Sequence, residues 1–187
     1  MPVATNDEVA MAVLLLVSIV VFYDGWRLIR SRVLVPKFGN LPEGGWAWTS
    51  DSGRELVRNG PNLVALAAMM VLPWMLAERS GTEEEFVLLF DMLLLLHCVW
   101  LIIPKRYAIT STHLFVDGMQ YSHAGLRYTG WKGGTRVVLQ RRGWWIFAPL
   151  PLGGVIDDLV EVAARLQALS EGGWVEFETE GGAEESE

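Results

Sequence analysis

Few residues of this 187-residue chain could do chemistry, and three of them lie close together in an apolar stretch. Asp91, His97 and Cys98 fall within residues 86–103, whose other side chains are apolar. A carboxylate in such a stretch is costly inside a membrane, so we expect Asp91 to face another helix, a partner subunit or water. Cys98 lies about two helical turns further on and shares that face. The pattern favours a helix-to-helix contact through Asp91 and Cys98, while a proton or ion pathway and a position near the membrane surface stay open.

His97 is the residue of this stretch that could hold a metal or cofactor. Adjacent residues on a helix point about 100° apart, so His97 and Cys98 do not converge on one ion. The stretch contains no Cys-x-x-Cys pair and no second histidine. We therefore predict no metal and no cofactor, and we leave open a haem or chlorophyll contact through His97. His113 and His123 flank a predicted hairpin and are more typical of surface histidines than of a facing pair.

No pattern in the sequence is typical of an enzyme. Residues 131–135 read Trp-Lys-Gly-Gly-Thr, but they lack the spacing and the following helix of a phosphate-binding loop. No nucleophile beside a base and no paired acids near a histidine occur in residues 105–170. The sequence therefore predicts a protein that is not an enzyme.

Basic and aromatic residues adjoin at Arg141, Arg142, Trp144 and Trp145, a combination that an anionic membrane surface attracts. Strand alternation lets only one of the two tryptophans face a core, so the other would contact lipid, a partner or a local loop. Three more tryptophans are candidates for contact with the membrane interface or a partner: Trp26, Trp46 and Trp48.

The apolar residues of the chain are concentrated in blocks. Hydrophobic residues make up 51% of the sequence and the mean hydropathy is +0.29. The predicted transmembrane domain, residues 1–104, holds spans at about 7–30, 61–78 and 83–103, each long enough to cross about 30 Å of hydrocarbon with its flanks. This distribution excludes a plain soluble enzyme and a nucleic-acid-binding domain, and a single cysteine excludes a disulfide scaffold.

Local signals mark where these helices begin and bend. Thr5 with Glu8, and Thr82 with Glu85, form the pattern of a capping box, which predicts a helix start at each place. Pro61 is expected at the first position of the second span, where its missing amide costs nothing. Pro73 lies within that span, where we expect a kink and a contact between helices.

Charges beside the spans predict the orientation. The expected loop at 31–60 and the exit of the third span are basic, whereas the opposite ends are mainly acidic. The positive-inside rule then places the N-terminus outside the cell and the C-terminal domain in the cytoplasm. We expect a multi-pass protein of the cytoplasmic (inner) membrane.

Residues 105–170 predict a small cytoplasmic domain of the α+β class. Strands are expected at 107–110, 113–116 and 119–122, with Asp117-Gly118 as a hairpin turn between the last two. A second hairpin is expected at Gly133-Gly134, followed by a breaker at 149–154 and an amphipathic helix from Ile156. Residues 171–187 form an acidic tail, in which Trp174 to Phe177 could add an edge strand.

The strand landmarks Tyr107-Ala-Ile-Thr, Leu114-Phe-Val-Asp-Gly118 and Val137-Val-Leu-Gln140 precede a single C-terminal helix. Residues 105–170 thereby resemble the pleckstrin-homology-like (PH-like) domains attached to membrane spans in prokaryotes, antiparallel sheets or barrels with one C-terminal helix. The resemblance implies a domain that docks proteins or lipid surfaces. Three spans before such a domain are similar to the architecture of photosynthetic complex assembly proteins. The segment Leu41-Pro-Glu-Gly-Gly45 weakly resembles the N-terminal motif of those proteins.

These observations predict a non-catalytic accessory, scaffold or assembly subunit of a larger membrane complex, such as a photosynthetic or respiratory one. Its partners would be other membrane subunits and the lipid bilayer, including anionic lipid, and not nucleic acid. Two alternatives remain open. One is a small transporter or a redox- or pigment-associated subunit that uses Asp91 or His97. The other is a sensor of anionic lipid that uses the arginine and tryptophan stretch.

Overall fold

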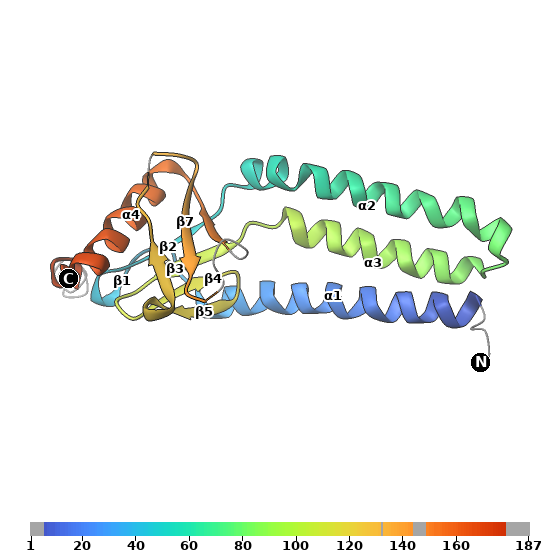
Figure 1. Cartoon of the computed structure of the whole chain (residues 1–187), viewed down its shortest axis with the longest axis horizontal. Helices are drawn as coiled ribbons and strands as arrows, with labels where there is room; N and C mark the ends of the chain where they lie inside the picture. Colours follow the sequence, from blue (N-terminus) through green and yellow to red (C-terminus); the bar gives the residue numbers. More distant parts are fainter. Residues whose placement is uncertain (1–5, 132, 144–148, 179–187) are drawn as a thin grey trace. The chain divides into compact units, whose positions relative to one another are not determined.

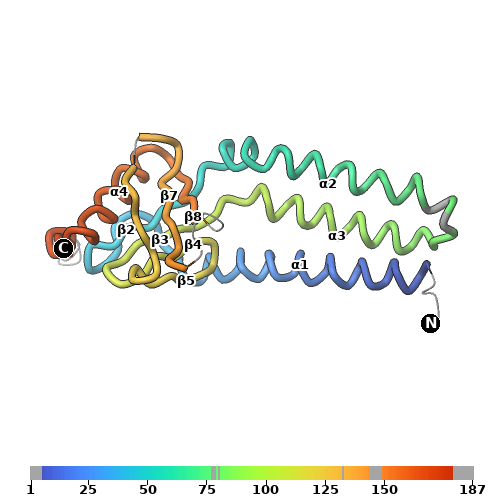
Figure 2. Tube along the Cα trace, viewed as in Figure 1, coloured from blue at the N-terminus to red at the C-terminus, as the bar shows by residue number. Residues whose placement is uncertain are grey.

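The computed structural model describes residues 6–131, 133–143 and 149–178. The chain divides into two compact units. The helical unit comprises residues 1–26 and 52–103, and the sheet unit comprises residues 27–51 and 104–187. Figures 1 and 2 trace the path of the chain through both.

The helical unit consists of long apolar helices. Three helices in the described part of the chain are long and apolar enough to cross a membrane: α1 (Asn6–Leu34), α2 (Ser52–Ser80) and α3 (Glu84–Ile102). Only 11%, 6% and 11% of their most apolar windows are buried inside the protein. Most of their apolar side chains therefore face outward, as is typical of helices that lipid or a partner covers. The predicted set of three long apolar helices is confirmed.

The helix boundaries differ from the predicted spans. α2 begins at Ser52, so Pro61 lies inside the helix together with Pro73 and does not start it. The ion pair of Arg58 with Glu55 and a hydrogen bond from Asn59 Nδ2 to the Leu101 carbonyl (2.9 Å) hold this extra length of helix. α2 is therefore longer than the predicted apolar block. Its first residues are polar, and their contacts stabilise helix that the hydrophobic pattern does not mark.

The predicted capping box at Thr82 does not fit the start of α3. Glu83 is the N-cap of α3, and its side chain makes no capping hydrogen bond. The Phe86 amide instead donates to the Glu83 carbonyl at 3.1 Å. The helix therefore starts one residue later than the capping box at Thr82 requires, and the acids Glu84 and Glu85 of its first turn complement the helix dipole. Thr5, the other predicted cap, lies outside the described residues.

The sheet unit contains two antiparallel sheets and a helix. In its described residues, one sheet runs in the order β1 (Gly39–Leu41), β2 (Gly45–Thr49), β3 (Arg106–Ile109), β4 (His113–Val116), β5 (Met119–Ser122). The other runs β6 (Leu126–Tyr128), β7 (Arg136–Arg141), β8 (Pro149–Gly153). The amphipathic helix α4 (Ile156–Glu171) follows β8 in the chain (Figure 1). Its buried side chains join both sheets in one core. The predicted antiparallel sheet domain with a C-terminal helix is confirmed.

Alternation along the strands builds this core. Trp48, Tyr107, Leu139 and Leu152 are all at most 1% exposed. Trp48 stacks on Tyr107, with ring centroids 5.3 Å apart, and its indole N–H donates to the Gly153 carbonyl at 2.9 Å. The Asp117-Gly118 turn between β4 and β5 has positive φ angles of 51° and 75°, which agrees with the predicted hairpin.

Segment 31–60, predicted as a loop, contains the end of α1, β1, a short 3-10 turn (Pro42–Gly44), β2 and the start of α2. β2 pairs with β3, with Thr49 opposite Arg106, although the α2–α3 hairpin separates the two strands in sequence. One more backbone hydrogen bond follows this pair of strands: the Ser50 amide donates to the Lys105 carbonyl at 2.8 Å. The sheet therefore combines strands that precede the α2–α3 hairpin in the sequence with strands that follow it.

Two further predicted features of the sheet unit are wrong. The expected breaker at 149–154 contains β8, in which Leu150 and Leu152 enter the core. β8 is an edge strand of its sheet, where prolines are tolerated because their missing amides can face away from the partner strand. Residues 175–178 are helical and do not form an edge strand, and the Trp174 indole N–H donates to the Glu43 carbonyl at 3.0 Å.

Candidate functional site

Asp91 on α3 joins the two helices of the α2–α3 hairpin. The indole Nε1–H of Trp74 on α2 donates to Asp91 Oδ2 at 2.6 Å. Asp91 Oδ1 is buried and accepts no hydrogen bond from the described residues. Among the described residues, the carboxyl group of Asp91 is thus hydrogen-bonded through one oxygen only. Sequence reasoning singled out Asp91 but did not identify Trp74 as its donor.

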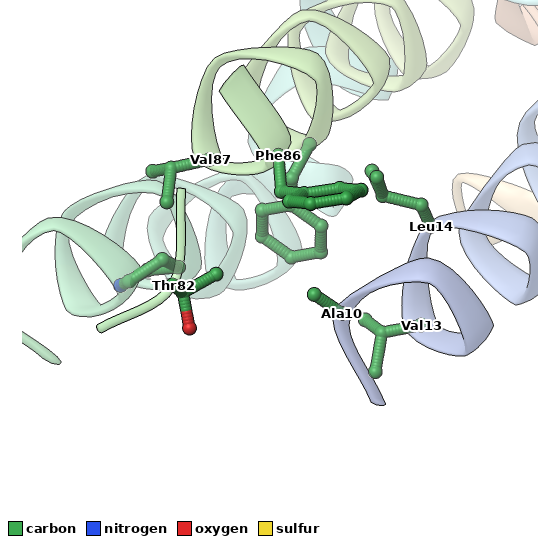
Figure 3. Close-up of a pocket in the computed structure, with 8 residues that line it drawn as sticks. Ala10, Val13, Leu14, Thr82, Phe86 and Val87 are labelled. Carbon is green, nitrogen blue, oxygen red and sulfur yellow. The ribbon is translucent and has the colours of Figure 1, made fainter. Parts of the chain in front are cut away.

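Pro73, which precedes this donor, borders an apolar cavity of about 160 Å³ in the helical unit. Residues of all three long helices and of the turn before α3 line it: Ala10, Val13, Leu14, Pro73, Thr82, Phe86, Val87 and Phe90. Figure 3 shows the Phe86 side chain of α3 facing Ala10 and Leu14 of α1. The third residue predicted for helix contact, Cys98, is a free and partly buried thiol.

His97 lies beside an acid that sequence reasoning did not select. His97 Nδ1 on α3 is 3.5 Å from Asp24 Oδ2 on α1, an ion-pair distance if the imidazole is protonated. Asp24 follows directly on the charge-free run of α1 from Val9 to Tyr23, and that position was the signal for it in the sequence. The pair links α1 to α3.

One helical turn from this pair, Trp100 packs on α1. A Cβ atom placed on Gly25 would lie 3.2 Å from the Trp100 indole ring, so the absence of a side chain at Gly25 makes room for it. The Trp100 Nε1 is buried and has no hydrogen-bond partner among the described residues. Asp24, His97 and Trp100 together place polar atoms between α1 and α3.

Within the sheet unit, Asp117 receives two basic side chains. Arg27 Nη2 lies 2.7 Å and Lys105 Nζ 3.1 Å from Asp117 Oδ2. Arg27 Nε also donates to the Asp117 carbonyl at 3.3 Å. Arg27, Lys105 and Asp117 all belong to the sheet unit, so Asp117 joins parts of this unit that are far apart in sequence.

The predicted interface tryptophans occupy three different settings. Trp48 is 1% exposed in the core of the sheet unit, so a contact with membrane or partner through Trp48 is wrong. The alternation of β2 turns it inward, under α4. Trp46 is partly buried, and its indole N–H donates to Asp158 Oδ1 at 3.3 Å. Trp26 is 47% exposed and lies beside Tyr23, with ring centroids 5.8 Å apart.

The two arginines predicted to meet the membrane also differ. Arg141 Nη2 donates to the hydroxyl of Tyr121 at 2.8 Å, and its guanidinium lies over the Tyr121 ring. Arg142 is exposed. Trp144 and Trp145 lie outside the described residues. Arg141 is thus held within the sheet unit, whereas the Arg142 side chain is exposed as far as the described residues show.

His113 and His123 do not form a facing ligand pair. His113 Nδ1 lies 2.8 Å from the Thr112 hydroxyl, whereas His123 Nε2 lies 2.8 Å from the Thr110 carbonyl. Burial lowers the pKa of His123 below its usual value near 6.5, and the nearby His113 acts in the same direction. Among the described residues, no group of three or more His, Cys, Asp or Glu side chains could hold a metal ion.

Fold and site together define a class: three long apolar helices joined to a two-sheet domain that one C-terminal helix closes. No family model, no curated protein and no solved structure matches this chain.

Proposed function

We propose that the chain is an integral membrane protein that serves as a non-catalytic accessory, scaffold or assembly subunit of a larger membrane complex. α1, α2 and α3 would cross the membrane, and the sheet unit would be a PH-like docking domain. Support for that domain type comes from its two antiparallel sheets and closing helix. The helices and the sheet unit would both take part in docking.

The pairing of β2 with β3 limits the possible topologies. β2 precedes the α2–α3 hairpin and β3 follows it, yet the two strands are neighbours in one sheet. Both strands must lie on the same side of a membrane, so α2 and α3 either both cross it or both do not. Arg54, Arg58, Lys105 and Arg106 at the strand-proximal ends of these helices support a cytoplasmic sheet unit. A crossing α1 then leaves the N-terminus outside.

The half-satisfied carboxylate of Asp91 carries the docking proposal. A buried carboxylate oxygen without a donor costs several kcal/mol in hydrocarbon, roughly the penalty of any unsatisfied polar group there. A donor from a partner helix would remove that penalty, and so would protonation with a partner acceptor. The outward apolar surfaces of α1, α2 and α3 provide the surrounding contact area.

Affinity purification of the tagged protein from its native membranes tests this function. The protein is extracted in a mild detergent, and co-purifying subunits are identified by mass spectrometry together with an absorption spectrum. We expect a stoichiometric set of larger membrane subunits with the wild-type chain and its loss with Asp91→Asn. Met92→Leu is the matched control, since Met92 is the next residue and is 66% exposed.

The outcomes are distinct. If the wild-type protein purifies alone, the accessory-subunit function is wrong. If Asp91→Asn retains the full set of subunits, the partner is held elsewhere and Asp91 is not the docking residue. Loss of subunits in Met92→Leu as well would indicate general disruption of α3 and not a specific contact.

The Asp24–His97 pair favours a second candidate, a redox- or pigment-associated subunit. A carboxylate that accepts from one imidazole nitrogen orients the ring and leaves the other nitrogen for an axial bond to haem or chlorophyll. His97 Nδ1 lies 3.5 Å from Asp24 Oδ2 but has no hydrogen-bond partner among the described residues, so this orienting hydrogen bond requires the two side chains to approach more closely. A visible absorption band that co-purifies with the wild-type chain and disappears in His97→Phe would support it, and a colourless wild-type protein would exclude it.

A further inference from the structure

The apolar cavity of the helical unit, of about 160 Å³, is large enough to hold a small molecule. An apolar protein cavity of about 150 Å³ stays free of water and takes up benzene or xenon. The described residues that line the present cavity come from α1, α2, α3 and the turn before α3, and all of them belong to the helical unit. Neither Asp91 nor His97 is among them, so the cavity is separate from the two polar contacts described above.

The walls of this cavity disfavour a polar ligand. Thr82 has the single polar side chain among the described residues that line it, and none of these residues carries a charge. A buried water molecule needs about two to four polar partners, and a buried ion needs more compensation than that. The ligand that fits these walls is therefore apolar and uncharged.

The aromatic residues of the wall favour a ring. Phe86 and Phe90 are one helical turn apart on α3, so both rings lie on the same face of that helix. The Phe86 side chain faces Ala10 and Leu14 of α1 (Figure 3). Aromatic rings attract one another in offset-stacked and edge-to-face arrangements, with centroids about 4.5–7 Å apart. A flat ring in the cavity gains these contacts, and a straight hydrocarbon chain of the same carbon number does not.

The cavity borders a part of α1 that packs less tightly than the part near α3 residue Trp100. Leu14 and Val21 are seven residues apart on α1 and share one face. Val21 is 1% exposed, whereas Leu14 and Ala10 beside the cavity stay partly exposed. Further along α1, Gly25 lies against the Trp100 ring, so side chains alone make the contact there. A ligand in the cavity supplies the corresponding contact between α1 and α3 at the other end.

We propose that this cavity binds a small uncharged aromatic hydrocarbon, a single ring with a total of about six to eight carbon atoms. Phe86 and Phe90 contact the ring, and the small side chain of Ala10 leaves the space for it. The site does not rest on the accessory-subunit function, because the ligand contacts this chain alone and binds it without a partner subunit.

Binding to the full chain in micelles of a neutral detergent tests the site. The probe is fluorobenzene, and fluorine NMR measures its dissociation constant as a mole fraction in the micelles. Benzene and n-hexane, which have the same number of carbon atoms, are the competitors. Ala10→Phe fills the cavity with a ring of its own. Ala12→Phe is the matched control, because Ala12 is exposed on the same helix and is not among the described residues that line the cavity.

We expect Ala10→Phe to bind fluorobenzene at least about tenfold more weakly than the wild-type chain, and Ala12→Phe to stay within about twofold. Benzene should compete at least about fivefold more strongly than n-hexane. An unchanged affinity in Ala10→Phe, or an equal loss in Ala12→Phe, would overturn the location. Equal competition by n-hexane would overturn the choice of a ring and indicate a hydrocarbon chain, such as that of a lipid.

A gain of binding distinguishes this site from a general loss of folding. Phe90→Ala removes a ring from the wall and enlarges the cavity. This variant should bind fluoronaphthalene, whose two fused rings exceed the wild-type cavity, at least about tenfold more tightly than the wild-type chain does. If Phe90→Ala does not bind fluoronaphthalene more tightly, the ligand does not occupy this cavity.

Discussion

Replacing Gly118 by alanine should destabilise the sheet unit by more than its backbone conformation alone explains. Gly118 has φ 75° in the β4–β5 turn, a left-handed conformation that costs an alanine about 1–2 kcal/mol. A Cβ atom there would also lie 2.2 Å from the Arg27 carbonyl oxygen, so one of the two segments must move by about 1 Å. That movement weakens the two hydrogen bonds from Arg27 to Asp117, a further loss of about 1–2 kcal/mol for a partly exposed pair.

The expected total for Gly118→Ala is about 3 kcal/mol, which corresponds to amide exchange roughly 100-fold faster. Gly133→Ala is the matched control, because Gly133 has φ 74° and no atom within 4 Å of an added Cβ. It should cost only the about 1–2 kcal/mol of backbone strain. Hydrogen exchange with mass spectrometry on β3 and β7 peptides of the full chain in detergent measures both. If the two variants exchange at the same rate, the close approach of Arg27 to the turn does not exist.

Three further predictions concern the same unit. Arg165→Met should lower the free energy of unfolding, measured in urea, by about 2–3 kcal/mol. The buried Arg165 donates to the Gly44 carbonyl at 2.9 Å, and methionine leaves that acceptor unsatisfied. A decrease under about 0.5 kcal/mol would contradict this. Leu139→Ala should cost about 2–5 kcal/mol, whereas its 40%-exposed neighbour Val138→Ala should cost under about 1 kcal/mol, and equal losses in the same assay would place Leu139 outside the core. The lowered pKa of His123 means that the unfolded chain binds its proton more readily, so stability should fall as the pH drops below about 6.5; a pKa above 6.5 in an NMR titration would reverse that sign.

Local signals predicted the elements that depend on neighbouring residues. The three long apolar helices, the Asp117-Gly118 hairpin and the amphipathic helix from Ile156 follow from length, turn chemistry and periodicity, which act over a few residues. β1, β2 and β8 were missed for a different reason. β2 is stabilised by β3, which lies beyond the whole α2–α3 hairpin, and no periodicity within residues 31–60 records that pairing. Pro149 and Pro151 likewise read as breakers until the edge position of β8 is known.

The residues of the candidate site also divide into those that local sequence signals predict and those that depend on contacts between distant segments. Asp91 was predictable because a charge inside an apolar helix is unusual whatever the fold. Its donor Trp74 and the acid beside His97 were not, because each contact requires the register of one helix against another. The partial signal was present: Asp24 and Arg27 are the first two charged residues after the charge-free part of α1. Asp24 contacts His97 of α3 in the helical unit, and Arg27 contacts Asp117 in the sheet unit. The boundary between the two units therefore falls within one helical turn of α1.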